Sequence, residues 1–93
     1  MAEYGAESLL ILVVDDNPDD LFLIRRDLLA LGHRVVGVST AREALDHLGR
    51  GRPDVLMTDV GLPGMDGIEV LKRTRAAGKR LPIIMLTAKS QEM

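Results

Sequence analysis

The sequence contains no cysteine and no tryptophan, and its aromatic residues are one tyrosine and one phenylalanine. Without thiols, neither a disulfide framework nor a thiolate metal site is possible. The longest apolar run, Leu9 to Val14, is far too short to cross a bilayer. These absences exclude a disulfide scaffold, a zinc–thiolate protein and a membrane-spanning segment in this sequence.

An excess of positive charge is also missing. The net charge is -2, and the twelve lysines and arginines are scattered along the chain, so there is no basic stripe for nucleic acid or an anionic membrane. The start, MAEYGAES, is acidic and lacks the basic and apolar regions of a signal peptide. We expect a cytoplasmic protein with one globular domain over residues 1–93, in which residues 1–8 form an N-terminal tail.

Four short apolar runs have the composition of buried β-strands. The first is rich in β-branched residues, is too short for a helix and ends at Asp15. Pro53 and Pro82 precede the third and fourth runs. The strands are expected at residues 9–14, 34–38, 54–59 and 83–87.

Three amphipathic segments between these runs begin with helix-capping residues. Asn17 caps the first, Ser39 or Thr40 caps the second, and Asp66 forms a capping box with Glu69 at the third. Glycines follow each segment and predict its end. The residues expected on the inner faces are Leu21, Ile24, Leu28 and Leu31, then Ala41, Ala44, Leu45 and Leu48, then Ile68 and Leu71.

Strands that alternate with helices predict an α/β fold, a doubly wound parallel sheet with right-handed crossovers. In such sheets, sites form beyond the carboxyl ends of the strands, where the strand order reverses. Asp15 and Asp16 close the first strand and Asp59 closes the third. With strand order 2-1-3-4 these three carboxylates converge in one crevice.

Three converging carboxylates require a cation or raised pKa values. Oxygen ligands without histidine or thiol favour a hard ion, most simply Mg²⁺. Asp59 is too far from the next helix to serve its start, and beside a cation it could attack a phosphoryl group and form an acyl phosphate. Asp19 and Asp20, by contrast, are explained by the positive end of a helix. Thr87 could donate to a phosphoryl oxygen, although threonine is also a common strand residue.

The segments LVVDD, TDVGLPGMDG and IIMLTA together resemble the receiver domain of two-component response regulators, over nearly the whole chain. The resemblance implies a flavodoxin-like fold and a Mg²⁺-dependent reaction. In that reaction a histidine kinase or phosphotransfer protein would donate its phosphoryl group to Asp59. It implies no enzymatic activity beyond the domain's own phosphorylation and dephosphorylation.

The resemblance also assigns roles to individual residues. Asp16 would bind the metal directly, Asp15 largely through water, and Asp59 and the backbone carbonyl of Gly61 would complete the protein ligands. Thr87 would be the switch hydroxyl that moves toward the phosphoryl group. The residues implied to shape the site are Ala88, which leaves room for the phosphoryl group, and Pro63 and Gly67, which shape the loop.

One departure from the family is the length of the chain. Receivers continue with a helix, a strand and a helix, and the missing strand carries a lysine that pairs with the phosphoryl group, whereas this chain stops at Met93. Lys89 lies in the wrong loop to replace that lysine. The fourth strand is therefore expected to be an open edge. Three outcomes are open: further residues follow Met93, the chain dimerises or swaps, or another piece completes it. If the 93 residues are the whole molecule, we expect a homodimer or swapped oligomer through this edge.

Three other functions fit parts of the sequence. A receiver-like docking module that works without phosphorylation is the main rival, favoured by the missing lysine. A phosphatase would need an acid two residues after Asp59, where Gly61 stands. A flavin site is disfavoured by the aspartates that follow the first strand, because they would repel a phosphate. His33 and His47 are expected at the surface without a phosphorelay role, and Met57 and Met85 in the strand core.

Overall fold

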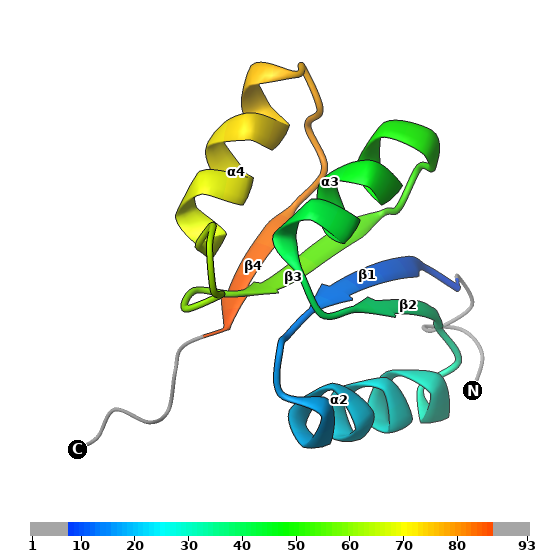
Figure 1. Ribbon diagram of the computed structural model, residues 1–93. Coiled ribbons are helices and arrows are strands. Elements are labelled where there is room, and N and C mark those ends of the chain that lie inside the picture. The colour runs from blue at the N-terminus through cyan, green and yellow to red at the C-terminus, as the bar shows by residue number, and fades with distance from the viewer. Residues whose placement is uncertain (1–7, 87–93) are drawn as a thin grey trace.

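The computed structural model describes residues 8–86 and confirms the predicted alternation of strands and helices (Figure 1). The first and third strands each begin one residue later than expected. The three helices begin directly after their predicted caps, Asn17, Thr40 and Asp66. The elements are β1 (Leu10–Val14), α2 (Pro18–Ala30), β2 (Arg34–Val38), α3 (Ala41–Arg50), β3 (Val55–Asp59), α4 (Gly67–Ala76) and β4 (Ile83–Leu86).

The four strands form one parallel sheet in the order β2-β1-β3-β4, as predicted. Val14 pairs with Val38 on one side and with Thr58 on the other, and Asp59 pairs with Leu86. Helix α2 covers one face of the sheet, and α3 and α4 cover the other (Figure 1). The chain therefore changes faces between β1 and β3, which is the point where a doubly wound sheet opens a crevice.

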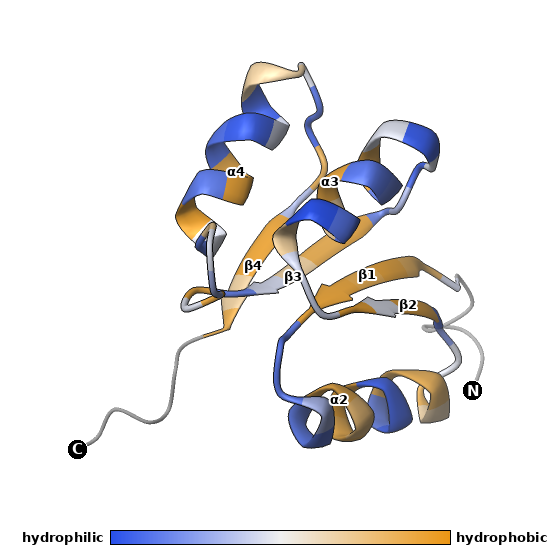
Figure 2. Ribbon diagram, viewed as in Figure 1, coloured by the Kyte–Doolittle hydropathy of each residue, from blue (hydrophilic) through white to orange (hydrophobic). Residues whose placement is uncertain are grey.

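The core lies between the sheet and the two helices α3 and α4. β1 is apolar at every position and is buried from Ile11 to Val14, as a strand covered on both faces should be (Figure 2). Burial of this strand from both sides holds the following aspartates at a fixed edge. The core cluster consists of Leu12, Val14, Ala41, Ala44, Leu48, Leu56, Leu62 and Val70.

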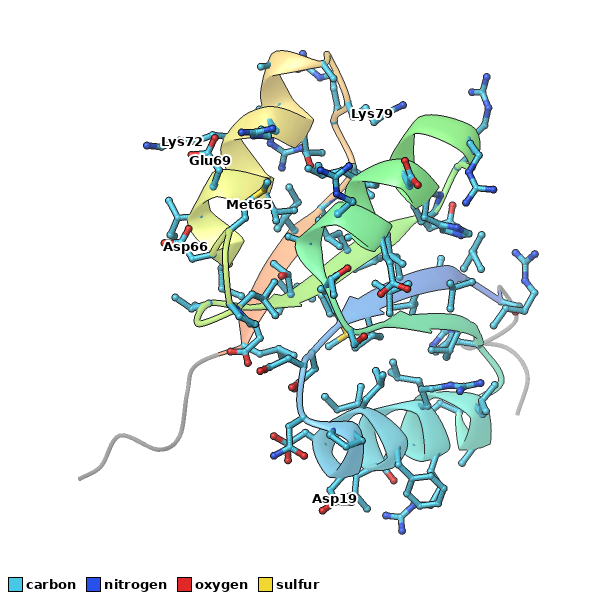
Figure 3. All side chains as sticks on the ribbon, in the orientation of Figure 1. Asp19, Met65, Asp66, Glu69, Lys72 and Lys79 are labelled. Carbon is cyan, nitrogen blue, oxygen red and sulfur yellow. The ribbon has the colours of Figure 1, made fainter. Side chains whose placement is uncertain are left out.

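The predicted helix caps are present, with one difference. Asn17 accepts hydrogen bonds from the backbone N–H groups of Asp19 and Asp20, and Thr40 forms the full reciprocal capping box with Glu43. At α4, Asp66 accepts from the backbone of Glu69, but the Glu69 side chain pairs with Arg73 at 3.0 Å instead of completing the box. Figure 3 places Asp66 and Glu69 along the beginning of α4.

The predicted inner face of α4 was wrong. Ile68 is 42% exposed and Leu71 is half-buried, whereas Val70 and Thr74 are buried. Thr74 can face the core because its hydroxyl donates to the carbonyl of Val70 at 2.7 Å, so no polar group is left unsatisfied. A polar residue at a buried position hid the true phase of this helix.

The predicted positions of Met57, Met85 and His33 were also wrong. Both methionines are half-buried rather than core residues, because within residues 8–86 the α2 face of the sheet is covered only over β1 and β2 (Figure 1). Ile84, which pairs with Met57, is 47% exposed on the same face. His33 is half-buried, and its Nδ1 accepts the backbone N–H of Leu9 at 3.2 Å.

Candidate metal centre at the carboxyl edge of the sheet

Three carboxylates meet where the strand order reverses. Asp15 and Asp16 follow β1, Asp59 ends β3, and one oxygen from each lies within 4.8 Å of the others. Asp15 is 5% exposed, Asp59 is half-buried and Asp16 is exposed. The neighbouring parallel strands bring together the three acids that the sequence singled out.

Asp15 is held by the backbone on both sides. Its N–H donates to the carbonyl of Val38 at 3.1 Å, and its Oδ1 accepts the N–H of Asn17 at 2.9 Å. Burial raises the pKa of the Asp15 carboxyl, the Asn17 hydrogen bond opposes this, and the charges of Asp59, Asp20 and Asp16 raise it further. The carboxylate therefore occupies a place where a counter-cation would lower its free energy.

Asp59 is fixed by the loop that follows it. The N–H of Gly61 donates to Asp59 Oδ1 at 3.3 Å, and the hydroxyl of the buried Thr58 donates to the Asp59 carbonyl at 3.1 Å. The next N–H, from Val60, donates to Leu86 on β4 at 3.3 Å. Thr58 is a site-supporting residue that sequence reasoning missed, because its position in the strand looks like ordinary β-propensity.

Gly67 was expected only to shape the loop, but it also contacts the backbone of Asp59. Its N–H donates to the Val60 carbonyl at 2.9 Å, and a Cβ built on it would collide with the carbonyl oxygen of Asp59. The start of α4 therefore packs directly against the backbone of the central carboxylate. In the same loop, Gly64 has φ of 82°, a left-handed conformation that favours glycine, while Pro63 is exposed.

The donor set fits a hard cation. Three carboxylates whose oxygens lie this close repel one another, and without thiols or histidines among them the set matches Mg²⁺ or a similar ion. Gly61 is exposed beside Asp59, which is compatible with the predicted use of its carbonyl, and that use stays a prediction. Thr87, Ala88 and Lys89 lie outside the described residues, so their predicted placement also stays a prediction.

The other acids after β1 are arranged differently. Asp19 points away from the sheet at the start of α2 (Figure 3), while the charge of Asp20 reaches Asp15 and contributes to its raised pKa. His47 is half-buried in α3, whereas the prediction placed it at the surface. His33 precedes β2 at the opposite end of the sheet, and neither histidine belongs to the three-carboxylate cluster.

The fold and site together define a doubly wound domain with an acidic pocket at its topological switch point. The sequence profile of the response regulator receiver domain matches residues 11–93. The chain belongs to the response regulator receiver domain family.

Similar proteins agree with this assignment. The chain is 43% identical over 82 residues to the alkaline phosphatase synthesis transcriptional regulatory protein PhoP of Bacillus subtilis, covering 88% of this chain and 34% of PhoP. It is 39% identical over 85 residues to the sensor protein EvgS of Escherichia coli, covering 91% of this chain and 7% of EvgS. The chain thus spans about a third or less of these relatives.

Solved structures show the same architecture. The response regulator TrrA of Thermotoga maritima, in complex with Mg²⁺–BeF, is 35% identical with a TM-score of 0.83, over 88% of this chain and 71% of TrrA. Chemotaxis response regulator CheY4 of Vibrio cholerae is 32% identical with a TM-score of 0.83, over 91% of this chain and 72% of CheY4. Among the described residues, no helix is both long enough and apolar enough to span a membrane.

Proposed function

We propose that this chain is a cytoplasmic phosphoacceptor in two-component signalling, and that Asp59 receives the phosphoryl group. The observation that carries the proposal is the convergence of Asp15, Asp16 and Asp59 within 4.8 Å at the edge where the strand order reverses. The donor would be a phosphohistidine on a histidine kinase or a phosphotransfer protein. Histidine kinases and phosphotransfer proteins are the partners of receiver domains in this family.

In the proposed reaction a carboxylate oxygen of Asp59 attacks the phosphorus of the phosphohistidine. An O–P bond forms, the P–N bond breaks, and its electron pair passes to the imidazole nitrogen. The hydrogen bond from the Gly61 N–H to Asp59 Oδ1 limits rotation of the attacking carboxylate. Packing of Gly67 against the Asp59 backbone fixes its depth in the crevice.

Asp15, Asp16, Asp59 and the Gly61 carbonyl would hold Mg²⁺. When bound, the ion would offset the repulsion between the carboxylates and the incoming phosphoryl group. The Mg²⁺–BeF complex of TrrA supports this assignment by similarity. We further propose that Thr87 donates to the phosphoryl oxygen as the switch hydroxyl, and that the small Ala88 leaves space for it.

The test is intact mass spectrometry after incubation with Mg²⁺ and acetyl phosphate, a small acyl-phosphate donor. We expect a phosphoryl adduct on the unmodified chain and none on Asp59→Asn. Asp46→Asn, which removes an exposed acid from α3, is the matched control and should keep the adduct. A folded chain that forms no adduct would favour the receiver-like docking module instead.

We also propose that the 93-residue chain self-associates through β4. Within the described sheet β4 is an edge strand, and Ile84 on it is 47% exposed beside the half-buried Met57. Sedimentation should show a dimer that Ile84→Lys weakens. Ile68→Lys, which changes an isoleucine of similar exposure on α4, should leave the dimer intact. Equal effects of the two changes would refute the proposal.

A further inference from the structure

A second charged region lies at the opposite end of the sheet from the carboxylates. The loop from α3 to β3 and the loop from α4 to β4 meet there and line two adjoining open surface hollows of about 410 and 370 Å³. Both hollows share Gly78, Lys79 and Arg80. Figure 3 shows Lys79 on the loop after α4, with its side chain on the side of that loop nearer to α3.

The charges around these hollows are mainly positive. Arg52, Lys79, Arg80 and Arg75 line them, with Asp54 as the one acid among the lining residues. The Asp54 carboxylate accepts a hydrogen bond from the backbone N–H of Leu10 at 2.8 Å, so this acid already has a partner within the protein. The ion pairs found among residues 8–86 are Arg26–Asp27 and Arg73–Glu69, so none of the lining cations has a carboxylate partner in that part of the chain.

Helix ends explain only part of this charge. Arg50 and Arg75 lie in the last turns of α3 and α4, where a cation meets the negative end of the helix. Arg75 Nη1 also donates to the carbonyls of Lys79 and Leu81, at 3.0 and 2.8 Å, and so holds the loop in shape. Arg52, Lys79 and Arg80 lie beyond both helices, and their charges serve no interaction within the described residues.

The shape of the region favours a small ligand. Its apolar wall contains the buried Leu48 and Pro53 and the half-buried Leu81, beside the three free cations. Each hollow has the volume of a small-molecule site. Arginine can bind a phosphate group through two parallel hydrogen bonds. Nucleic acid would need a longer basic track than three residues, on a chain whose net charge is -2.

We propose that Arg52, Lys79 and Arg80 form a binding site for a small phosphorylated anion, at the opposite edge of the sheet from the acceptor carboxylate. The site uses no residue of the acidic cluster. Its occupation therefore does not depend on phosphorylation of Asp59 or on Mg²⁺. Arg75 is a positioning residue for the loop rather than a ligand-binding residue.

The test is an NMR titration of the full chain with pyrophosphate, in metal-free buffer at constant ionic strength and in the Asp59→Asn background. We expect saturable shifts of backbone signals at residues 51–53 and 78–81. The double variant Lys79→Gln with Arg80→Gln should weaken binding by about tenfold or more. The lower bound is the effect of losing a single charge-assisted hydrogen bond. Arg75 is left unchanged in this design because its loss would disturb the loop itself.

Arg26→Gln is the matched control, because it removes an exposed cation from α2 that is already paired with Asp27. It should leave the affinity for pyrophosphate unchanged. Shifts that grow linearly without saturation, or equal weakening in the control, would overturn the proposal. Binding to anionic vesicles without saturable pyrophosphate binding would also overturn it and would indicate a membrane-facing surface.

Discussion

Replacing Gly67 by alanine tests the packing that positions Asp59. The added Cβ would collide with the Asp59 carbonyl oxygen, and it would also come within 3.2 Å of the Val60 Cα. Because both obstacles are backbone atoms, no side-chain rotation relieves the clash. The start of α4 and the end of β3 must separate by roughly an ångström to restore ordinary contact.

Overpacking of this kind costs about 1–3 kcal/mol. For a domain of this size each kcal/mol lowers the melting temperature by about 4–8 °C. The separation also strains the hydrogen bond from the Gly67 N–H to the Val60 carbonyl, in the loop that holds the carboxylate. We therefore expect Gly67→Ala to lower both the free energy of unfolding and the rate of phosphoryl adduct formation.

Urea unfolding and adduct formation from acetyl phosphate measure the two effects. Gly49→Ala is the control for stability, because nothing lies within 4 Å of its added Cβ in α3, and it should stabilise the helix by about 0.5–1 kcal/mol. Gly61→Ala is a second control, because it adds a methyl group to the loop after Asp59 where nothing lies within 4 Å. Gly67→Ala with unchanged stability and unchanged adduct formation would refute the packing argument.

Three further changes have defined outcomes. Asp15→Asn should raise the melting temperature in metal-free buffer, since it removes a buried charge, and should abolish the stabilisation by Mg²⁺; an equal Mg²⁺ response in both chains would contradict this. Asn17→Ala should cost about 1 kcal/mol of unfolding free energy, measured with urea, because two N–H groups lose their acceptor. The backbone N–H of Ser39 and the hydroxyl of Thr40 lower the pKa of Glu43, so its stabilisation is present at neutral pH and is lost as pH falls through the lowered pKa. Glu43→Gln should therefore be less stable than the unmodified chain at neutral pH and equally stable in acid, and a pH-independent difference in melting temperature would contradict the assignment.

The sequence was sufficient to predict the sheet and the meeting of the carboxylates. Strand runs separated by helix caps leave few topologies, and the carboxyl ends of parallel strands share one edge. The convergence of Asp15 and Asp59 could therefore be predicted from the sequence. The receiver resemblance added the family, which the sequence profile and the structural relatives confirm.

Details that depend on what packs against each element could not be predicted. The inner face of α4 was misassigned because a buried Thr74 satisfies its own hydroxyl within the helix. Met57 was expected in the core because its strand is apolar, but its burial depends on cover from elements beyond that strand. The contact between Gly67 and the Asp59 carbonyl depends on the angle at which α4 leaves its loop, and no sequence pattern encodes that angle.

The measurement that tests the central claim most directly is the location of the phosphoryl group. The chain is incubated with acetyl phosphate, with or without Mg²⁺, and then treated with borohydride, which reduces an aspartyl phosphate to homoserine. Peptide mapping should find homoserine at position 59 only when Mg²⁺ is present. Homoserine at another aspartate, or at position 59 in equal amount without Mg²⁺, would contradict the account.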